Sequence, residues 1–394
     1  MKRDTILVHA GRDPHANHGI INPPVYHAST VLYRTLDDFE AAQKHREYGK
    51  TYYGLLGTPT TFALEEVVAK LEGAHRCRAV GSGLAAITAP LVGCLKSGDH
   101  LLMVDNTYAP SRRFCDGTLK RYGVETTYYD PKIGVEIAKL FRPNTRVLFM
   151  ESPGSYTFEM QDVPAMAAVA RQAGIVSMMD NTWASPLYFQ PLAHGVDVSI
   201  QAATKYLCGH SDVIMGTVAT NEALTERVEG AIRELGYFAA PDDCYLVLRG
   251  MRTMALRLPR HWQTGLTLAR WFQQQPEVDR VYHPALPDDP GHAIWKRDFT
   301  GSTGLFSVGF KAIPRAGYAA LIDGMKLFGM GASWGGFESL LLPGNPAPIR
   351  TATKWNAPGP LLRIHAGLED PADLIADFDA GFGRLRAAMR ASAG

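Results

Sequence analysis

The sequence predicts an α/β protein, with helices on both faces of a mostly parallel sheet and a smaller α+β domain after it. Helical patterns alternate with short apolar runs from about residue 60 to residue 220, as in strands joined by crossover helices. The chain has 394 residues, of which 46% are hydrophobic and 20% charged, so it can form two domains with substantial cores. Polar clusters follow the apolar runs, where ligands bind in open α/β sheets.

The elements of the first domain follow one another in a regular order. Residues 61–73 form an apolar stripe at helical spacing after Thr60, which predicts a capped helix. A proline begins the compact helix expected at 164–172, and residues 186–195 form a short crossover. Strands are expected at residues 101–104, 147–150, 175–179 and 196–200.

Three segments are expected along the chain. Residues 1–55 form an extended arm, rich in Pro, Asn and His in its middle, that wraps on a partner subunit. Residues 56–248 form the ligand-binding domain, and residues 249–394 form a C-terminal domain. The remaining helices are expected at 222–235, 242–257, 262–275 and 371–389, and the remaining strands at 304–310 and 361–365.

The composition excludes several classes of partner. Forty basic and thirty-nine acidic residues leave a formal charge of +1, so bulk charge predicts neither a nucleic-acid nor a membrane partner. We find no apolar run long enough to span a bilayer and no cleavable leader pattern at the start. The five cysteines include no Cys-x-x-Cys pair, and their odd number argues against a disulfide framework. We therefore expect a cytoplasmic protein that acts on a small molecule, with no metal site.

Lys205 and Asp180 are the most informative pair of residues. Asp180 ends one apolar run, and Lys205 follows the next one in the stretch Ala203-Thr204-Lys205-Tyr206. A lysine and a carboxylate at the carboxyl ends of neighbouring strands suit pyridoxal 5'-phosphate, because the lysine can hold the cofactor as a Schiff base and the carboxylate can keep its ring nitrogen protonated. Lys205 is then the expected base for a proton at Cα.

A glycine-containing turn before a helix predicts a phosphate site. Residues 81–86 read Gly-Ser-Gly-Leu-Ala-Ala, so Gly83 and Leu84 would present backbone N–H groups at a helix N-terminus. Ordinary turn chemistry is the alternative explanation for such glycines. Thr204 adds a hydroxyl beside Lys205 that is expected to reach the same phosphate.

Two further side chains are candidates for the site. Tyr108 follows a strand, where its ring can stack on a flat cofactor or simply pack in a loop. Arg363 lies in the otherwise apolar run 361–364 and requires a charged partner. A substrate carboxylate matches its two-pronged guanidinium, and an internal salt bridge is the alternative.

Several motifs together resemble a known family. The runs 201–207, 209–212 and 180–183 resemble the Cys/Met-metabolism branch of fold type I pyridoxal phosphate enzymes, and the resemblance extends from about Thr5 to Arg384. Within that branch, Glu-Ser-Pro-Gly-Ser at 151–155 and Ser-Trp-Gly-Gly at 333–336 are similar to bacterial cystathionine β-lyases. The γ-acting relatives usually have Pro-Thr-Asn-Pro and Ser-Leu-Gly-Gly at these places.

The resemblance implies a fold type I architecture, with a mostly parallel seven-stranded sheet in the domain that binds the cofactor. It also implies a shared site in a dimer, commonly doubled into a homotetramer, with Tyr53 entering from the neighbouring subunit. The catalytic residues would be Lys205, Tyr53 and Tyr108. The residues that it implies for cofactor binding are Lys205, Asp180, Tyr108, Gly83, Leu84, Thr204 and Tyr53, and those for substrate binding are Arg363, Ser333, Trp334 and Tyr108.

The activity implied by the resemblance is that of cystathionine β-lyase, which cleaves L-cystathionine to homocysteine, pyruvate and ammonia in methionine biosynthesis. A γ-acting relative, such as cystathionine γ-synthase, cystathionine γ-lyase or an O-acylhomoserine sulfhydrylase, is the first alternative. A non-catalytic binding or regulatory relative is the second.

One position departs from the family pattern. The family motif Tyr-x-Arg reads Tyr53-Gly54-Leu55 in this chain, so the arginine that would bind the phosphate across the dimer is absent. Losing such a charge-assisted contact would cost on the order of 1.5 to 3 kcal/mol of cofactor binding unless it is replaced. Arg112 and Arg113 are candidate replacements for the phosphate, or ligands for the distal carboxylate of the substrate, and surface arginines are the alternative.

Overall fold

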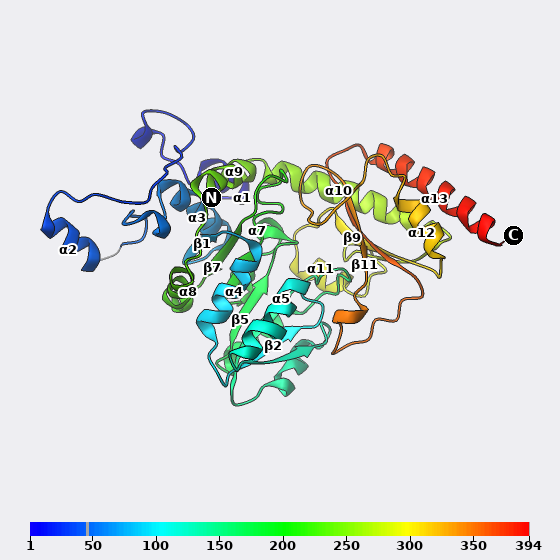
Figure 1. Ribbon diagram of the computed structural model, residues 1–394, viewed down its shortest axis with the longest axis horizontal. Coiled ribbons are helices and arrows are strands. Elements are labelled where there is room, and N and C mark those ends of the chain that lie inside the picture. Colours follow the sequence, from blue (N-terminus) through cyan, green and yellow to red (C-terminus); the bar gives the residue numbers. More distant parts are fainter. Residues whose placement is uncertain (45–46, 394) are drawn as a thin grey trace.

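The computed structural model describes residues 1–44 and 47–393, and its largest sheet has seven strands (Figure 1). The strands are β1 (Arg76–Val80), β2 (His100–Val104), β3 (Glu125–Tyr129), β4 (Thr145–Glu151), β5 (Val176–Asp180), β6 (Val198–Gln201) and β7 (Gly216–Thr220). Their order across the sheet is β1-β7-β6-β5-β4-β2-β3. β7 is antiparallel to both of its neighbours, and the other strands run in one direction. The predicted seven-stranded, mostly parallel sheet is confirmed.

Helices cover both faces of this sheet because successive residues of each strand point in opposite directions. Leu101 and Met103 pack on one face with α4 (Gly83–Cys94) and α8 (Glu222–Glu234), whereas Leu102 and Val104 pack on the other face. The helices on the second face are α3 (Pro59–Glu72), α6 (Val163–Gln172) and α9 (Pro241–Met251). Three shorter helices of this part of the chain are α5 (Ala109–Phe114), α7 (Ser185–Tyr188) and, nearer the second sheet, α11 (His292–Asp298).

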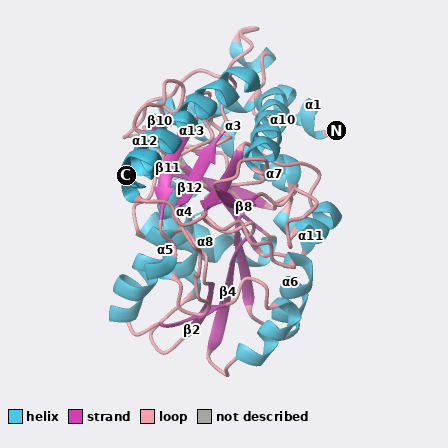
Figure 2. Ribbon diagram, turned by 90° about the vertical axis from the view of Figure 1, so that its right-hand side faces the viewer, coloured by secondary structure: helices cyan, strands magenta, loops and turns pink. Residues whose placement is uncertain are grey.

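A second, mostly antiparallel sheet lies in the C-terminal half (Figure 2). Its strands are β8 (Val278–Tyr282), β9 (Leu305–Phe310), β10 (Gly329–Met330), β11 (Leu340–Gly344) and β12 (Leu361–His365), in the order β10-β11-β12-β9-β8. Its buried face packs against α10 (Met254–Phe272), α12 (Arg315–Ile322) and α13 (Pro371–Ala393) around Phe272, Phe378 and Phe382. The predicted domain boundary at 248/249 lies inside α9, and the division into domains stays a prediction.

The expected elements correspond to observed ones, with one boundary in the wrong place. The sequence pattern placed a helix end at residue 257 and a new start at 262, around Pro259. The structure instead ends α9 at Met251 and runs α10 from Met254 through Pro259. Proline removes one backbone donor near the start of α10, but Leu258 and His261 on either side of it are fully buried, so packing holds the helix together.

The N-terminal arm is extended only in part. The expectation that the first fifty residues contain no helix was wrong, because α1 (Arg3–His9) and α2 (Leu36–Lys44) form there. α1 buries a single residue, Leu7, and therefore has no apolar stripe for the sequence to reveal. Between the helices the chain is largely extended, and Figure 1 shows α2 projecting away from the body of the protein.

Two other expectations concern cysteines and membrane spans. All five cysteines are free, and four of them, including Cys208, are buried. In the part of the chain that the structure describes, no helix combines the length and the apolar character needed to cross a membrane.

Candidate active site

The site lies at the carboxyl ends of β4, β5 and β6. Glu151 ends β4 and Asp180 ends β5, and the two residues are partners in the parallel register. Lys205 follows β6 after three intervening residues, and its backbone N–H donates to the carbonyl of Ala202. The strands themselves are buried, whereas Lys205 and Asp180 are partly accessible. The sheet therefore delivers these polar side chains to one edge that a ligand can reach.

Lys205 contacts a loop that is distant in the sequence. Its Nζ donates to Oγ of Ser333 at 2.6 Å and lies 5.6 Å from the ring centroid of Trp334. Burial, together with the positive charge of Arg363, lowers the pKa of Lys205 to about 8. A substantial fraction of the Lys205 amine is thus neutral near pH 8, which is the form that attacks a carbonyl or accepts a proton.

Asp180 is held by Thr182 in the loop after β5. Its Oδ1 accepts from the Thr182 backbone N–H at 3.0 Å and from Oγ1 of Thr182 at 2.5 Å. The Thr182 hydroxyl in turn accepts from the backbone N–H of Ala202, which ties the ends of β5 and β6 together. Burial raises the pKa of Asp180, so a cationic ring nitrogen placed against it would stabilise the charged carboxylate.

Glu151 belongs to the same group of residues, although the sequence analysis did not include it among the site residues. Its Oε2 accepts from the backbone N–H of Tyr108 at 2.7 Å and from Oγ1 of Thr107 at 3.1 Å, and its Oε1 accepts from Ser155 at 2.9 Å. Burial and the charge of Asp180 raise the pKa of Glu151 to about 8. Glu151 therefore fixes the backbone of Tyr108. Its position in the sequence could have identified it as a site residue, because Glu151 ends an apolar run as Asp180 does.

Tyr108 and Arg363 lie on either side of these carboxylates. The side chain of Tyr108 is 46% exposed, and burial and the negative charge of Asp180 raise the pKa of its phenol. Arg363, on β12, donates from Nη2 to the carbonyl of Ser333 at 2.8 Å. Among the described residues Arg363 has no carboxylate within ion-pair distance, so the alternative of an internal salt bridge has no support in the structure.

The loop from Ser333 to Gly336 joins the two halves of the site. Ser333 has a φ of 77°, which is unusual for a residue other than glycine, and Gly335 has a φ of 86°. A Cβ on Gly335 would lie 3.0 Å from Cα of Lys205, so only glycine fits between the loop and the lysine backbone. The strained loop thus holds Ser333 between Lys205 and Arg363.

The N-terminus of α4 fits the predicted phosphate site. Ser82 caps the helix by accepting from the Ala85 N–H at 3.0 Å, and in the described chain no acceptor is recorded for the N–H groups of Gly83 and Leu84. A Cβ on Gly83 would come within 2.6 Å of the Cβ of Ala202. Two free N–H groups at the positive end of a twelve-residue helix suit a phosphate.

The structure does not bring every predicted residue to this site. The Thr204 hydroxyl already donates to the carbonyl of Met215 and accepts from its N–H, so its phosphate role stays a prediction. Tyr53 is 49% exposed, and its place in the site of a neighbouring subunit stays a prediction. Arg112 is buried against Asp105 at 3.3 Å, which neutralises its charge, whereas Arg113 is exposed.

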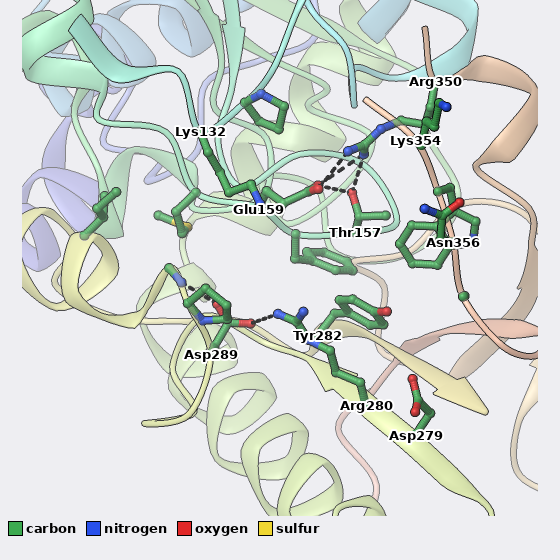
Figure 3. Close-up of a pocket in the computed structure, with 18 of the residues that line it drawn as sticks. Lys132, Thr157, Glu159, Asp279, Arg280, Tyr282, Asp289, Arg350, Lys354 and Asn356 are labelled. Atoms are coloured by element: carbon green, nitrogen blue, oxygen red, sulfur yellow. Dashed lines mark hydrogen bonds and ion pairs between the residues drawn. The ribbon is translucent and has the colours of Figure 1, made fainter. Parts of the chain in front are cut away.

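A separate cavity of about 520 Å³ lies beside the site and is lined by none of the predicted site residues (Figure 3). Two ion pairs join charged side chains of its lining. Arg350 contacts Oε1 of Glu159 at 2.7 Å and Oδ2 of Asp105 at 3.3 Å, and Arg280 lies 3.8 Å from Asp289. The reactive arrangement is therefore the one around Lys205.

The fold and these residues define an enzyme that uses pyridoxal 5'-phosphate, and comparison with known proteins identifies the family. The family model of Cys/Met metabolism PLP-dependent enzymes matches residues 4–383. The chain belongs to this family, and its cofactor is pyridoxal 5'-phosphate.

Full-length relatives are found in several bacteria. Cystathionine beta-lyase MetC of Escherichia coli is 43% identical over 390 residues, which are 98% of this chain and 99% of the relative. Cystathionine beta-lyase of Haemophilus influenzae is 41% identical over 387 residues, which are 97% of this chain and 98% of the relative. The crystal structure of cystathionine gamma-lyase from Lactobacillus plantarum complexed with L-serine is 29% identical, with a TM-score of 0.88 and coverage of 98% of this chain and 100% of the other.

Proposed function

We propose that this protein is a cystathionine β-lyase, which converts L-cystathionine and water into homocysteine, pyruvate and ammonia. The observation that carries the proposal is the full-length similarity to enzymes of that name at 41 to 43% identity. Trp334 and the Gly154-Ser155 pair, which distinguish β-lyases from γ-acting relatives, support it from within the chain. Five free cysteines agree with the reducing conditions of a cytoplasmic location.

Each residue of the site has a separate role in the proposed reaction. When bound, pyridoxal 5'-phosphate supplies a sink for the electrons left at Cα after the proton is removed. Lys205 would hold the cofactor, and its Nζ, once free, would accept the Cα proton of the substrate. Asp180 would keep the ring nitrogen protonated, Tyr108 would contact the ring, and Gly83, Leu84 and Thr204 would hold the phosphate.

The α-carboxylate of the substrate would bind between Arg363 and Ser333. Arg363 is partly buried and has no carboxylate partner in the described chain, so its charge is available for a substrate anion. Its link to the Ser333 carbonyl fixes the orientation of the guanidinium. Trp334 closes this side of the site beside Lys205.

We propose that the active enzyme is a homotetramer of site-sharing dimers. The extended arm exposes large apolar side chains that water solvates poorly, among them Ile20 at 58%, Ile21 at 59%, Leu32 at 88% and Leu36 at 68%. A second subunit would cover them and receive Tyr53. Sedimentation with and without residues 1–35 would test the role of the arm.

Product analysis with L-cystathionine tests the function directly. We expect pyruvate and homocysteine in equal amounts from the purified protein loaded with cofactor. Formation of 2-oxobutyrate and cysteine would assign the enzyme to the γ-acting alternative. The absence of any product from several thioether amino acids, with the cofactor still bound, would favour the non-catalytic alternative.

Arg113 is expected to read the distal carboxylate of L-cystathionine. Arg113 is exposed, and its charge partly offsets the burial and the Asp180 charge that raise the pKa of the Tyr108 phenol, so Arg113 lies near Tyr108. We expect Arg113→Ala to raise KM for L-cystathionine about 3- to 5-fold, since an exposed ion pair contributes up to about 1 kcal/mol. KM for S-ethyl-L-cysteine, which has no distal carboxylate, should not change.

Exposed Arg121 supplies the control for this experiment. Arg121→Ala should leave both KM values unchanged. If Arg113→Ala instead weakens cofactor binding and affects both substrates equally, Arg113 binds the phosphate and the distal-carboxylate role is wrong.

The lowered pKa of Lys205 predicts the pH dependence of cofactor capture. Only the neutral amine attacks the aldehyde of the cofactor, so the capture rate of the cofactor-free protein should rise with pH and level off above a midpoint near 8. With a lysine of the ordinary pKa of 10.5, the capture rate would still increase beyond pH 10. Arg363→Leu should move the midpoint upward, because the charge of Arg363 lowers the pKa of Lys205. A midpoint at 10 or above in the unmodified protein would contradict the assignment.

A further inference from the structure

We propose that His365 is a positioning residue that holds the Ser333–Gly336 loop in the shape that binds the substrate α-carboxylate. This inference rests on the proposed function, because it assigns a support to the carboxylate site formed by Ser333 and Arg363. Neither the sequence motifs nor the resemblance assigned His365 a role. The loop and its supports all lie within the residues that the structure describes.

His365 is directed at the glycine pair of the loop. Its Nε2 lies 3.1 Å from the backbone N of Gly335 and 3.1 Å from the carbonyl oxygen of Gly336. With Nε2 unprotonated, the ring accepts from Gly335, and with Nε2 protonated it donates to Gly336. The first tautomer anchors the loop at Gly335, which contacts the Lys205 backbone, and the second anchors it at the neighbouring Gly336.

The position of His365 on β12 explains how one strand serves both halves of the carboxylate site. Residues two apart on a strand point to the same face. Arg363 and His365 are such a pair, and both reach the loop, Arg363 at the Ser333 carbonyl and His365 at the glycines. The strand therefore sets the distance between the guanidinium and the loop that faces it.

The loop needs an external support because its backbone is strained. Ser333 holds a φ of 77°, a region that costs a residue with a side chain on the order of 1 kcal/mol or more. Without the contact from His365, the loop could relax and carry Ser333 away from Lys205 and Arg363. Trp334, the next residue of the loop, packs on Tyr206 with ring centroids 5.4 Å apart. This contact holds the Trp334 side chain but not the backbone of the two glycines that follow.

An uncharged side chain is required at this position. Lys205 and Arg363 both carry positive charge nearby, and burial is the main reason why the pKa of His365 lies well below its ordinary value. An uncharged imidazole holds the loop and leaves Arg363 free for the substrate. A carboxylate at the same place would pair with Arg363 and compete with the substrate anion.

The test compares two amides of different length at position 365. The side-chain oxygen of His365→Gln can reach the Gly335 N–H as Nε2 does, whereas that of His365→Asn is too short. Each variant, loaded with cofactor, is titrated with L-alanine and with ethylamine, and binding is followed by the absorbance of the cofactor. The two ligands differ only in the α-carboxylate, which is replaced by a hydrogen atom in ethylamine, so the ratio of their dissociation constants reports carboxylate recognition.

We expect His365→Asn to raise the dissociation constant of L-alanine about 10-fold, which is the cost of an unmade buried hydrogen bond. The dissociation constant of ethylamine should not change. His365→Gln should stay within about 3-fold of the unmodified protein for both ligands. His261→Asn is the matched control, because His261 is equally buried and lies 5.1 Å from His365 but makes no contact with the loop.

Each other outcome counts against a specific claim. Equal weakening of both ligands, or the same ratio in the His261 control, would reduce His365 to a packing role and overturn the proposal. Unchanged L-alanine binding in His365→Asn would overturn it as well. If the unmodified protein itself fails to prefer L-alanine over ethylamine, the carboxylate site is wrong and the proposed function loses its substrate model.

Discussion

Replacing Lys205 by alanine should lower kcat for L-cystathionine by about 10³-fold or more, because we propose that this one side chain is both the cofactor anchor and the base. The position of the Lys205 Nζ supports this double role, because Nζ contacts Ser333 and the positive charge of Arg363 helps to lower its pKa. The cofactor should still bind, since Asp180 and the N-terminus of α4 remain. Turnover is measured by pyruvate release, and bound cofactor by absorbance after gel filtration.

Lys132 provides a matched control for this variant. It is an exposed lysine at the separate cavity, where Figure 3 shows it, and Lys132→Ala should retain full activity. Residual activity above a tenth in Lys205→Ala, with the control intact, would exclude Lys205 as the base. Complete loss of cofactor from the variant would show that the covalent link dominates binding.

Replacing Asp180 by asparagine should slow Cα proton exchange by about 10²-fold, because a neutral amide no longer holds the ring nitrogen as a cation. The amide oxygen can still accept from the Thr182 N–H, so the local fold is retained. Exchange of the Cα proton of L-alanine in D2O, followed by NMR, isolates this step from the departure of the thiol. Cofactor affinity should fall at the same time.

Glu151→Gln separates the role of Asp180 from that of its neighbour. Glu151 lies beside Asp180 in the register, but it contacts Tyr108 and Ser155. We expect exchange in Glu151→Gln to remain within about 10-fold of the unmodified rate, since an amide keeps most of these contacts. An equal loss in both variants would mean that the pair of carboxylates, and not Asp180 alone, supports the ring nitrogen.

Local patterns predicted most of the large domain correctly. β4 and β5 are nearly continuous apolar runs, as expected of strands buried on both faces, and each ends in a carboxylate. The order of strands and helices then places Asp180 and Lys205 at one edge of the sheet. This inference needed only local periodicity and the rule that parallel strands share a ligand-binding edge.

The misplaced boundary and the missed helices had a different cause. A proline in a helical pattern predicts an end, yet α10 continues through Pro259 because of the packing on both sides of it. α2 exposes Leu36 and Phe39, so its apolar residues do not face a core within this chain. Packing against distant residues decided the first case, whereas α2 buries no residue within this chain and so has no core-facing stripe for a sequence pattern to reveal.

The fold class, the pairing of Asp180 with Lys205 and the glycine turn at α4 could be predicted from the sequence alone, because each depends on residues close together in the chain. The tertiary structure was needed to see how the C-terminal sheet completes the site. Ser333 contacts Lys205 across 128 residues of sequence, and His365 supports that contact from a strand of the other sheet. The structure likewise showed that Asp105 neutralises Arg112 and that Glu151 holds Tyr108. Such contacts depend on how two separately patterned sheets pack together, and that packing minimises the free energy of the whole chain through buried apolar area and satisfied polar groups, not through a local preference.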